Sequence, residues 1–346
     1  MRAKKKEVLN ETGLIKEIEK ISLITQKFNK SIIIKSIGDD CAIFRDKNSM
    51  LVSTDNITEN VHFTLKFYSF YEIGSKSLLV NLSDIAAMGG TPRLFTLSLF
   101  IPEYVNEENI KETLYGVVGV AKKYRVSLIG GNISRASEFS ISITIIGDYK
   151  DENVIKRGNS KIGDAVFVSG EIGNSWMTYY LQKQEKRINK NYINLKNFEK
   201  KNIENFISKF KLPTPRIKLA KELAAKKLAN SLTDISDGLY KDISNILRFS
   251  QGALIWINEL PVNENLKHIA GLLKIRKCAD NIISFGEDYE LLWTTDDKNE
   301  KEVLNLSSRL GIKIKKIGRV VNGINGIKFL KNGVAYPIKD STFRHL

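Results

Sequence analysis

Carboxylates gathered in short clusters beside apolar runs constrain this chain more than any other feature of its sequence. The eight that carry this argument are Asp39 and Asp40 in IGDDCAIF, Asp55 in STDNITENVHF, Asp84 in NLSDIAAMGG, Asp234 and Asp237 in TDISDGL, and Glu287 and Asp288 in FGEDYELL. Neighbouring carboxylates repel one another and raise each other's pKa, so clusters placed in this way need cations nearby. Mg²⁺ prefers such hard oxygen ligands. The sequence therefore predicts a site where several Mg²⁺ ions bind phosphate groups.

The charge of the chain indicates a small anionic substrate and not a nucleic acid. The 346 residues carry a net charge of +15 and are 42% hydrophobic, which is enough for two domains with ordinary cores. The lysines lie mostly in polar stretches such as KQEKRINKNY, and no Arg-rich or RNP-like aromatic motif accompanies them. We interpret the excess as solvated surface that also attracts a polyanionic substrate.

The cysteine count and the N-terminus favour a cytoplasmic protein. Cys41 and Cys278 are the only cysteines, so neither a disulfide framework nor a four-cysteine zinc site can form. The basic N-terminus leads into the amphipathic segment GLIKEIEKI and not into an apolar signal core. No apolar run approaches the ~20 residues of a membrane-spanning helix, so we expect no membrane partner.

Hydrophobic periodicity predicts an α/β or α+β protein with two domains, each a sheet covered by helices. The first domain, residues 10–149, is expected to contain helices at about 10–28, 71–88 and 107–124, with strands between them. A polar, turn-rich segment after Tyr149 is predicted as the boundary, so the second domain spans 150–346. Its expected helices follow Gly173 and lie at about 202–210, 216–229, 239–250 and 301–310, with a surface loop or loosely held helix at 182–201.

Asp84 is the sharpest anomaly in the first domain. It falls in the last two turns of its predicted helix, where the helix dipole disfavours a negative charge, and its neighbours are apolar. A buried arginine is one possible partner, and a metal ion shared with Asp40 and Asp55 is another that accounts for all three carboxylates. Asp55 is expected to end a strand, where Ser53 and Thr54 offer further oxygen ligands.

The other motifs also have purely structural interpretations. Turns account for the glycine-acid pairs of GDD and GED. Ser236 or Asp237 would serve as the N-cap of the following helix, although capping leaves Asp234 unexplained and a helix N-terminus also favours phosphate. A lone histidine such as His62 is more often a core or edge residue than a functional one. P-loop, protein-kinase, Gly-x-Ser-x-Gly and His-Glu-x-x-His motifs do not occur.

The ordered motifs resemble those of the thiamine-monophosphate kinase family. They read IGDDCA, STD, ENVHF, NLSDIAAMGGTP, LIGGN, KRG, TPR, DISDGL, GEDYELL and FRH, and they cover the chain from about Thr12 to His345. The resemblance implies the two-domain fold shared with aminoimidazole ribonucleotide synthetase, with an N-terminal sheet domain that binds ATP and Mg²⁺ and dimerises, and a C-terminal α/β domain that completes the active site. It implies transfer of the γ-phosphoryl group of ATP to thiamine monophosphate in a homodimer.

The site residues follow from the same resemblance. The magnesium ligands it implies are Asp40, Ser53, Thr54, Asp55, Asp84, Asp234 and Asp237, of which Asp84 and Asp237 are expected at the catalytic centre. The ATP contacts it implies are Gly131, Arg157 and Ser236, and the substrate contacts are His62, Glu287 and Phe343. The chain departs from the family at Asn132, which replaces the metal-binding aspartate of GGD, and at Phe285, which replaces a glycine of GGED.

The chemistry of the implied reaction is consistent with these residues. A phosphate acceptor is already ionised at neutral pH, so no strong base is needed, and the difficulty is to bring two polyanions together. We expect direct transfer without a phosphoenzyme, with several Mg²⁺ ions and Arg157 around the phosphates. Two alternatives remain open: another ATP-using enzyme of the same superfamily, and a non-catalytic dimer that binds nucleotides or thiamine phosphates.

Overall fold

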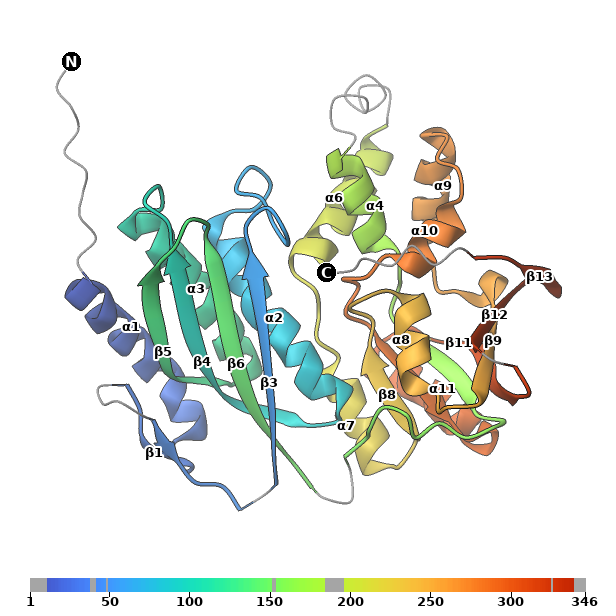
Figure 1. Cartoon of the computed structure of the whole chain (residues 1–346), viewed down its shortest axis with the longest axis horizontal. Coiled ribbons are helices and arrows are strands. Elements are labelled where there is room, and N and C mark those ends of the chain that lie inside the picture. The colour runs from blue at the N-terminus through green and yellow to red at the C-terminus, as the bar shows by residue number, and fades with distance from the viewer. Residues whose placement is uncertain are drawn as a thin grey trace. The chain divides into compact units, whose positions relative to one another are not determined.

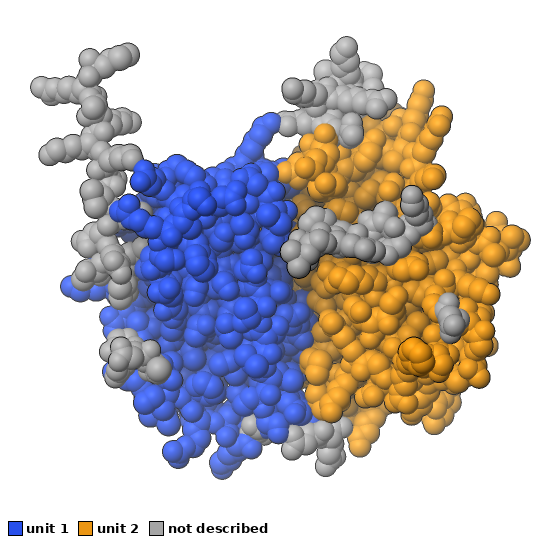
Figure 2. Space-filling model, in the orientation of Figure 1, with its two compact units in different colours: residues 1–85, 90–151 blue, residues 86–89, 152–346 orange. Residues whose placement is uncertain are grey.

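The structure of the chain is a computed structural model, which describes residues 11–37, 42–47, 49–150, 154–183, 196–324 and 326–338. Two compact units divide the chain (Figure 2). Unit 1 comprises residues 1–85 and 90–151, and unit 2 comprises residues 86–89 and 152–346. Each unit has a main sheet and buried apolar side chains of its own.

Unit 1 is built around a four-stranded sheet. Its elements are α1 (Glu11–Gln26), η1 (Lys27–Asn29), β1 (Ile33–Lys35), β2 (Ile43–Phe44), β3 (Ser49–Thr58), α2 (Phe70–Ala87), β4 (Thr91–Ile101), α3 (Glu107–Tyr124), β5 (Ser127–Arg135) and β6 (Ser140–Tyr149). The order of the sheet is β3-β6-β4-β5, with β6 antiparallel to both neighbours and β4 parallel to β5. Strands β3 and β5 therefore form opposite edges of this sheet.

The two faces of the unit 1 sheet differ in polarity. Apolar residues such as Leu97 and Ile143 are buried on the face covered by α2 and α3 (Figure 1). These two helices approach so closely that a Cβ atom at Gly74 would lie 2.0 Å from the carbonyl oxygen of Thr113. The opposite face carries exposed or half-buried polar side chains and is called the polar sheet face below. Its members are Thr54, Asn56, Thr96, Ser98, Asn132, Ser142 and Thr144.

Unit 2 contains a seven-stranded mixed sheet of order β13-β12-β9-β11-β7-β10-β8. Its elements are β7 (Ala165–Ser169), α4 (Asn174–Lys183), α6 (Asn197–Lys211), α7 (Ile217–Ala225), β8 (Ser231–Asp234), α8 (Leu239–Ile246), β9 (Gln251–Trp256), η3 (Ile257–Glu259), α9 (Glu264–Leu272), α10 (Cys278–Ser284), β10 (Leu291–Thr295), η4 (Asp297–Asn299), α11 (Glu300–Leu310), β11 (Ile314–Asn322), β12 (Gly326–Lys331) and β13 (Val334–Tyr336).

The centre of unit 2 is covered on both sides of its sheet. Every residue of β7, β8 and β10 is buried, as expected for strands that lie between two layers. Trp293 on β10 stacks on Phe167 of β7, with 5.6 Å between the ring centroids and an interplanar angle of 16°. Both rings are fully buried, so this stack forms part of the core.

The structure corrects several expectations about the elements. Helices α9 and α10 were not predicted, because nine and seven residues are too short to show a clear helical period. Of the segment 182–201, predicted as a surface loop or loosely held helix, residues 182–183 end α4, residues 197–201 begin α6, and residues 184–195 lie outside the described part of the chain. Asp55 does not end its strand and lies well inside β3. Among the described helices, none is long and apolar enough to cross a membrane.

Candidate functional site

The end of α2 and the middle of β3 bring three of the predicted residues of unit 1 together. Side chains alternate along β3, so Ser53 and Asp55 both lie on the face toward α2. The Ser53 hydroxyl donates to Oδ2 of Asp84 at 2.6 Å, and the backbone N–H of Asp55 donates to Oδ1 of Asn81 at 3.1 Å. Asn81 and Asp84 are three residues apart and therefore share one face of the helix. The half-buried Asp84 carboxylate is thus held against the strand.

Thr54 and Asn132 lie on the other face of the same sheet. The Thr54 and Thr144 hydroxyls are 2.6 Å apart on the polar sheet face. Asn132 is opposite Ser98 on this face, but it belongs to edge strand β5, whereas Thr54 belongs to the other edge. With ~4.8 Å between neighbouring strands, three strand spacings separate the two edges. Unit 1 by itself therefore does not bring Asn132 to the Ser53 and Asp84 side chains.

Gly131 and His62 have local roles that the structure makes plain. Gly131 shares the α2 side of the sheet with Asp55, and a Cβ atom at Gly131 would lie 2.0 Å from the carbonyl oxygen of Leu97. Only glycine fits there. His62 follows β3 in a turn, where its Nδ1 accepts a hydrogen bond from the backbone N–H of Thr58 at 3.1 Å. The neutral imidazole consequently carries its proton on Nε2.

A third carboxylate, not predicted from the sequence, lies four residues after the TDISDG motif of unit 2. Asp234 ends β8 and is 1% exposed, and Asp242 lies in the first turn of α8. Burial, followed by the charges of Asp234 and Asp237, raises the pKa of Asp242 to about 8. Its Oδ2 accepts the N–H groups of Asp237 at 3.2 Å and Gly238 at 3.1 Å.

The structure corrects the expected N-cap of α8. The N-cap residue is Gly238, and no side chain at that position caps the helix. Neither Ser236 nor Asp237 takes this role; the Asp237 carboxylate instead pairs with Lys241 at 2.8 Å. Asp242 satisfies the N–H groups at the start of the helix from inside it. The signal for this was an aspartate in the first turn, four residues after the glycine.

The GEDYE segment lies directly against the TDISDG motif. The N–H of Glu287 donates to the carbonyl of Ser236 at 2.9 Å, and the N–H of Tyr289 donates to that of Ile235 at 2.9 Å. A Cβ atom at Gly286 would lie 2.0 Å from the Ser236 carbonyl oxygen. Two motifs that are about fifty residues apart in the sequence therefore form one backbone-paired platform that carries Ser236 and Glu287.

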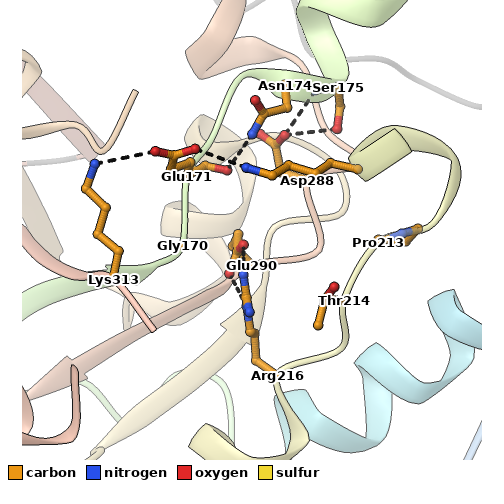
Figure 3. A pocket seen from close by; sticks show the side chains of 11 residues that line it. Gly170, Glu171, Asn174, Ser175, Pro213, Thr214, Arg216, Asp288, Glu290 and Lys313 are labelled. Carbon is orange, nitrogen blue, oxygen red and sulfur yellow. Dashed lines mark hydrogen bonds and ion pairs between the residues drawn. The ribbon is translucent and has the colours of Figure 1, made fainter. Parts of the chain in front are cut away.

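A cavity of about 160 Å³ adjoins this platform (Figure 3). Its lining residues are Gly170, Glu171, Asn174, Ser175, Lys209, Pro213, Thr214, Arg216, Asp288, Glu290 and Lys313. Burial raises the pKa of Asp288 to about 7, although the carboxylate accepts hydrogen bonds from the N–H groups of Gly173 and Ser175 at 2.8 and 3.3 Å. No role was predicted for Arg216 or Glu290, although they lie in the TPR and GEDYELL motifs.

The remaining predicted residues add little to this geometry. Arg157 is exposed in a turn ahead of β7. Asp40 and Phe343 lie outside the described residues. Within the described ranges, no three histidine, cysteine, aspartate or glutamate side chains converge closely enough to hold a metal ion.

Comparison with known proteins shows that the two units match the two domains of one protein family. Residues 38–149 match the family AIR synthase related protein, N-terminal domain, and residues 161–329 match AIR synthase related protein, C-terminal domain. The fold is accordingly the two-domain AIR synthase-like α/β fold that the sequence predicted, and that prediction is confirmed.

More specific relatives identify the branch of that class. A thiamine-monophosphate kinase of Buchnera aphidicola subsp. Acyrthosiphon pisum is 34% identical over 335 residues, covering 95% of this chain and 98% of the relative. The crystal structure of thiamine-monophosphate kinase from Stenotrophomonas maltophilia K279a has a TM-score of 0.79 at 29% identity and covers 95% of this chain and 98% of its own. The structure of AaThiL complexed with AMPPCP and TMP has a TM-score of 0.72 at 30% identity and covers 100% of this chain and 99% of its own. This chain belongs to the thiamine-monophosphate kinase family.

Proposed function

We propose that this protein transfers the γ-phosphoryl group of ATP to thiamine monophosphate, which yields thiamine diphosphate and ADP. The observation that carries the proposal is the near-complete coverage of a relative bound to an ATP analogue and TMP, at 30% identity. The paired platform of Ser236 and Glu287, with Asp234 and Asp237 beside it, supports it from the residues of this chain. Membership of a kinase family supports catalysis over the non-catalytic alternative.

The acidic residues of each unit are suited to hold Mg²⁺. In unit 2, burial raises the pKa of Asp242 to about 8, and the neighbouring charges of Asp234 and Asp237 add to the effect. A cation bound beside these three carboxylates would relieve their mutual repulsion. In unit 1, Ser53, Asp55 and Asp84 offer hard oxygen atoms on one side of the sheet. Bound Mg²⁺ would supply the positive charge that lets two phosphates approach.

The residues of the chain then have distinct tasks in a direct, in-line transfer. An oxygen of the acceptor phosphate forms a bond to the γ-phosphorus while the bond from that phosphorus to the β–γ bridging oxygen breaks, and ADP leaves. The acceptor oxygen is already ionised, so no side chain has to remove a proton. Glu287 and His62 orient thiamine monophosphate, and Gly131, Arg157 and Ser236 contact ATP. Asp84 and Asp237 would hold the Mg²⁺ ions that position the reacting phosphates.

An ADP-release assay with purified protein tests this function. We expect ADP release in the presence of Mg²⁺ to depend on thiamine monophosphate and thiamine diphosphate to appear in equal amount. Turnover with a different acceptor would indicate another activity of the same superfamily. Binding of both ligands without ADP release would indicate a non-catalytic protein.

A homodimer is expected to form through the polar sheet face. Val52 on the same face is 73% exposed, and the described residues place no helix over this side of the sheet. A two-fold axis would let this face pack against its own copy. Sedimentation should show a species of twice the chain mass of 39.2 kDa. Val52→Lys should shift it toward monomer, whereas Val334→Lys, at a residue 70% exposed on β13, should not. A fully active monomer at micromolar concentration would contradict the proposal.

Asn132→Asp is expected to lower the Mg²⁺ concentration at half-maximal activity by roughly fivefold. An amide oxygen can bind Mg²⁺ but brings no charge, and a restored carboxylate would add about 1 kcal/mol of attraction at a solvated site. Titrating Mg²⁺ against thiamine diphosphate formation measures the change. Asn305→Asp, which adds the same charge on the exposed side of α11, is the matched control. An unchanged or higher Mg²⁺ midpoint for Asn132→Asp would exclude Asn132 from the metal site.

A further inference from the structure

The backbone of the GEDYE segment is strained at two positions. Glu287 has φ of 62° and Tyr289 has φ of 50°, both in the left-handed region that residues other than glycine seldom adopt. Such a conformation costs about 1–2 kcal/mol per residue and persists only where the surroundings hold it. Since Glu287 is one of the two residues, the direction of its side chain depends on whatever maintains this strain.

Two acids of the segment, half-buried Asp288 between the strained positions and buried Glu290 directly after them, anchor it on its cavity side. Asp288 accepts the N–H groups at the start of α4, and the Ser175 hydroxyl donates to the Glu287 carbonyl oxygen at 2.7 Å. Glu290 is 7% exposed and accepts the hydroxyl of Ser169 at 2.6 Å. The same hydroxyl oxygen accepts a hydrogen bond from the N–H of Leu291 at 2.9 Å. Ser169 therefore contacts both the Glu290 side chain and the backbone of the next residue.

Arg216 completes the anchor of Glu290. Its Nε donates to one carboxylate oxygen at 2.6 Å and its terminal nitrogen donates to the other at 2.5 Å, with side-chain exposures of 19% for Arg216 and 9% for Glu290 (Figure 3). A two-point contact of this kind fixes orientation as well as distance, which a lysine ammonium cannot do. A Cβ atom at Gly170 would lie 1.9 Å from Glu290, so the carboxylate has no room to move that way.

Displacement of Glu290 would reach the TDISDG motif directly. The N–H of Ile235 donates to the carbonyl of Glu290 at 2.8 Å, and the N–H groups of Tyr289 and Glu287 donate to residues 235 and 236. The position of Glu290 therefore affects the backbone at both Glu287 and Ser236, which are the proposed contacts of thiamine monophosphate and ATP.

We propose that Arg216, which lies outside the implied ligand contacts, is a positioning residue that acts through Glu290 to hold Glu287 and the TDISDG motif in their working geometry. The inference rests on the proposed function, because its readout is the kinetics of thiamine monophosphate phosphorylation. Arg216 itself contacts no reacting group in this scheme. Arg216 contributes by fixing the orientation of the Glu290 carboxylate, so a positive charge without the two-point contact would not replace it.

Arg216→Lys tests the proposal with charge retained and the two-point contact removed. We expect a rise of about tenfold or more in the KM for thiamine monophosphate and a higher Mg²⁺ midpoint, with a thermal transition close to that of the wild type. A merely structural ion pair would lower the fraction of active protein, so kcat would fall while KM and the Mg²⁺ midpoint stay unchanged. Arg309→Lys, in the surface pair of Arg309 with Glu222, is the matched control and should change neither.

The single variant Glu290→Gln and the double variant Arg216→Lys/Glu290→Gln test whether the two residues act together. If Arg216 acts through Glu290, the double variant is expected to raise the KM no further than the larger of the two single changes. Additive effects, or an unchanged KM in folded Arg216→Lys, overturn the proposal. Failure of both single variants to fold also overturns it, because the pair would then support unit 2 as a whole. Absence of acceptor-dependent turnover in the wild type would instead reject the proposed function itself.

Discussion

Asp84→Asn is expected to lower turnover of ATP with thiamine monophosphate by about 10³-fold and to leave the fold intact. The amide oxygen can still accept the hydrogen bond that the Ser53 hydroxyl now donates at 2.6 Å, so α2 and β3 keep their contact. What is lost is one negative charge at the proposed Mg²⁺ site. A bound metal ion lowers the free energy of the transition state by several kcal/mol, and a loss of about 4 kcal/mol corresponds to the expected 10³-fold fall in turnover.

Steady-state turnover at saturating Mg²⁺, together with thermal melting, measures this effect. Glu108→Gln, which removes a carboxylate from the exposed first turn of α3, is a matched control and should retain near-normal turnover. Near-normal turnover of a well-folded Asp84→Asn variant would remove Asp84 from the metal site. A variant that melts far below the wild type would show that the carboxylate is needed for the fold instead.

Gly286→Ala is expected to lower turnover by about 10²-fold and the melting temperature of the protein by several degrees. The added Cβ would lie 2.0 Å from the Ser236 carbonyl oxygen and 2.8 Å from the carbonyl carbon of Asp237, so the paired platform must separate. Forced overpacking costs about 1–3 kcal/mol, and a displacement of about 1 Å at a reacting site costs roughly 10² in rate.

Gly271→Ala provides the control for this change. Gly271 lies in α9 with no atom within 4 Å of its would-be Cβ, and alanine in an open helical position stabilises by about 0.5–1 kcal/mol. Differential scanning calorimetry and the ADP-release assay on both variants separate local crowding from the general effect of a methyl group. Equal behaviour of the two variants would contradict the tight pairing of residues 286 and 236.

The sequence predicted most of the long elements because their signals are local. Asp84 was expected in the last two turns of its helix, and α2 indeed ends three residues later. The glycines of AAMGG and the proline that follows stop a helix by their own conformational preferences. Family motifs distributed along the whole chain supported the fold class, which the comparisons confirm. These signals concern residue type and short spacing, both of which can be read from the sequence.

Placement across a sheet could not be predicted in the same way. Asn132 and Asp55 were both expected to bind Mg²⁺, and the sequence did not show that they lie on opposite edges and opposite faces of the unit 1 sheet, because strand order depends on long-range pairing. The role of Asp242 was not predicted, because its carboxylate accepts backbone N–H groups that come together only when α8 forms. The Arg216–Glu290 pair joins residues 74 apart in sequence, a separation over which a single sequence carries no pairing signal.

The tryptophans, including Trp293 in its stack on Phe167, give unit 2 an intrinsic fluorescence signal that needs no label. Trp176, Trp256 and Trp293 are the only tryptophans, and all three fall in unit 2. Intrinsic tryptophan emission in a urea titration therefore follows unit 2 alone, while far-ultraviolet circular dichroism follows the helices and strands of both units. Two curves that coincide would mean that the units melt as one cooperative system, and two that separate would give each its own midpoint.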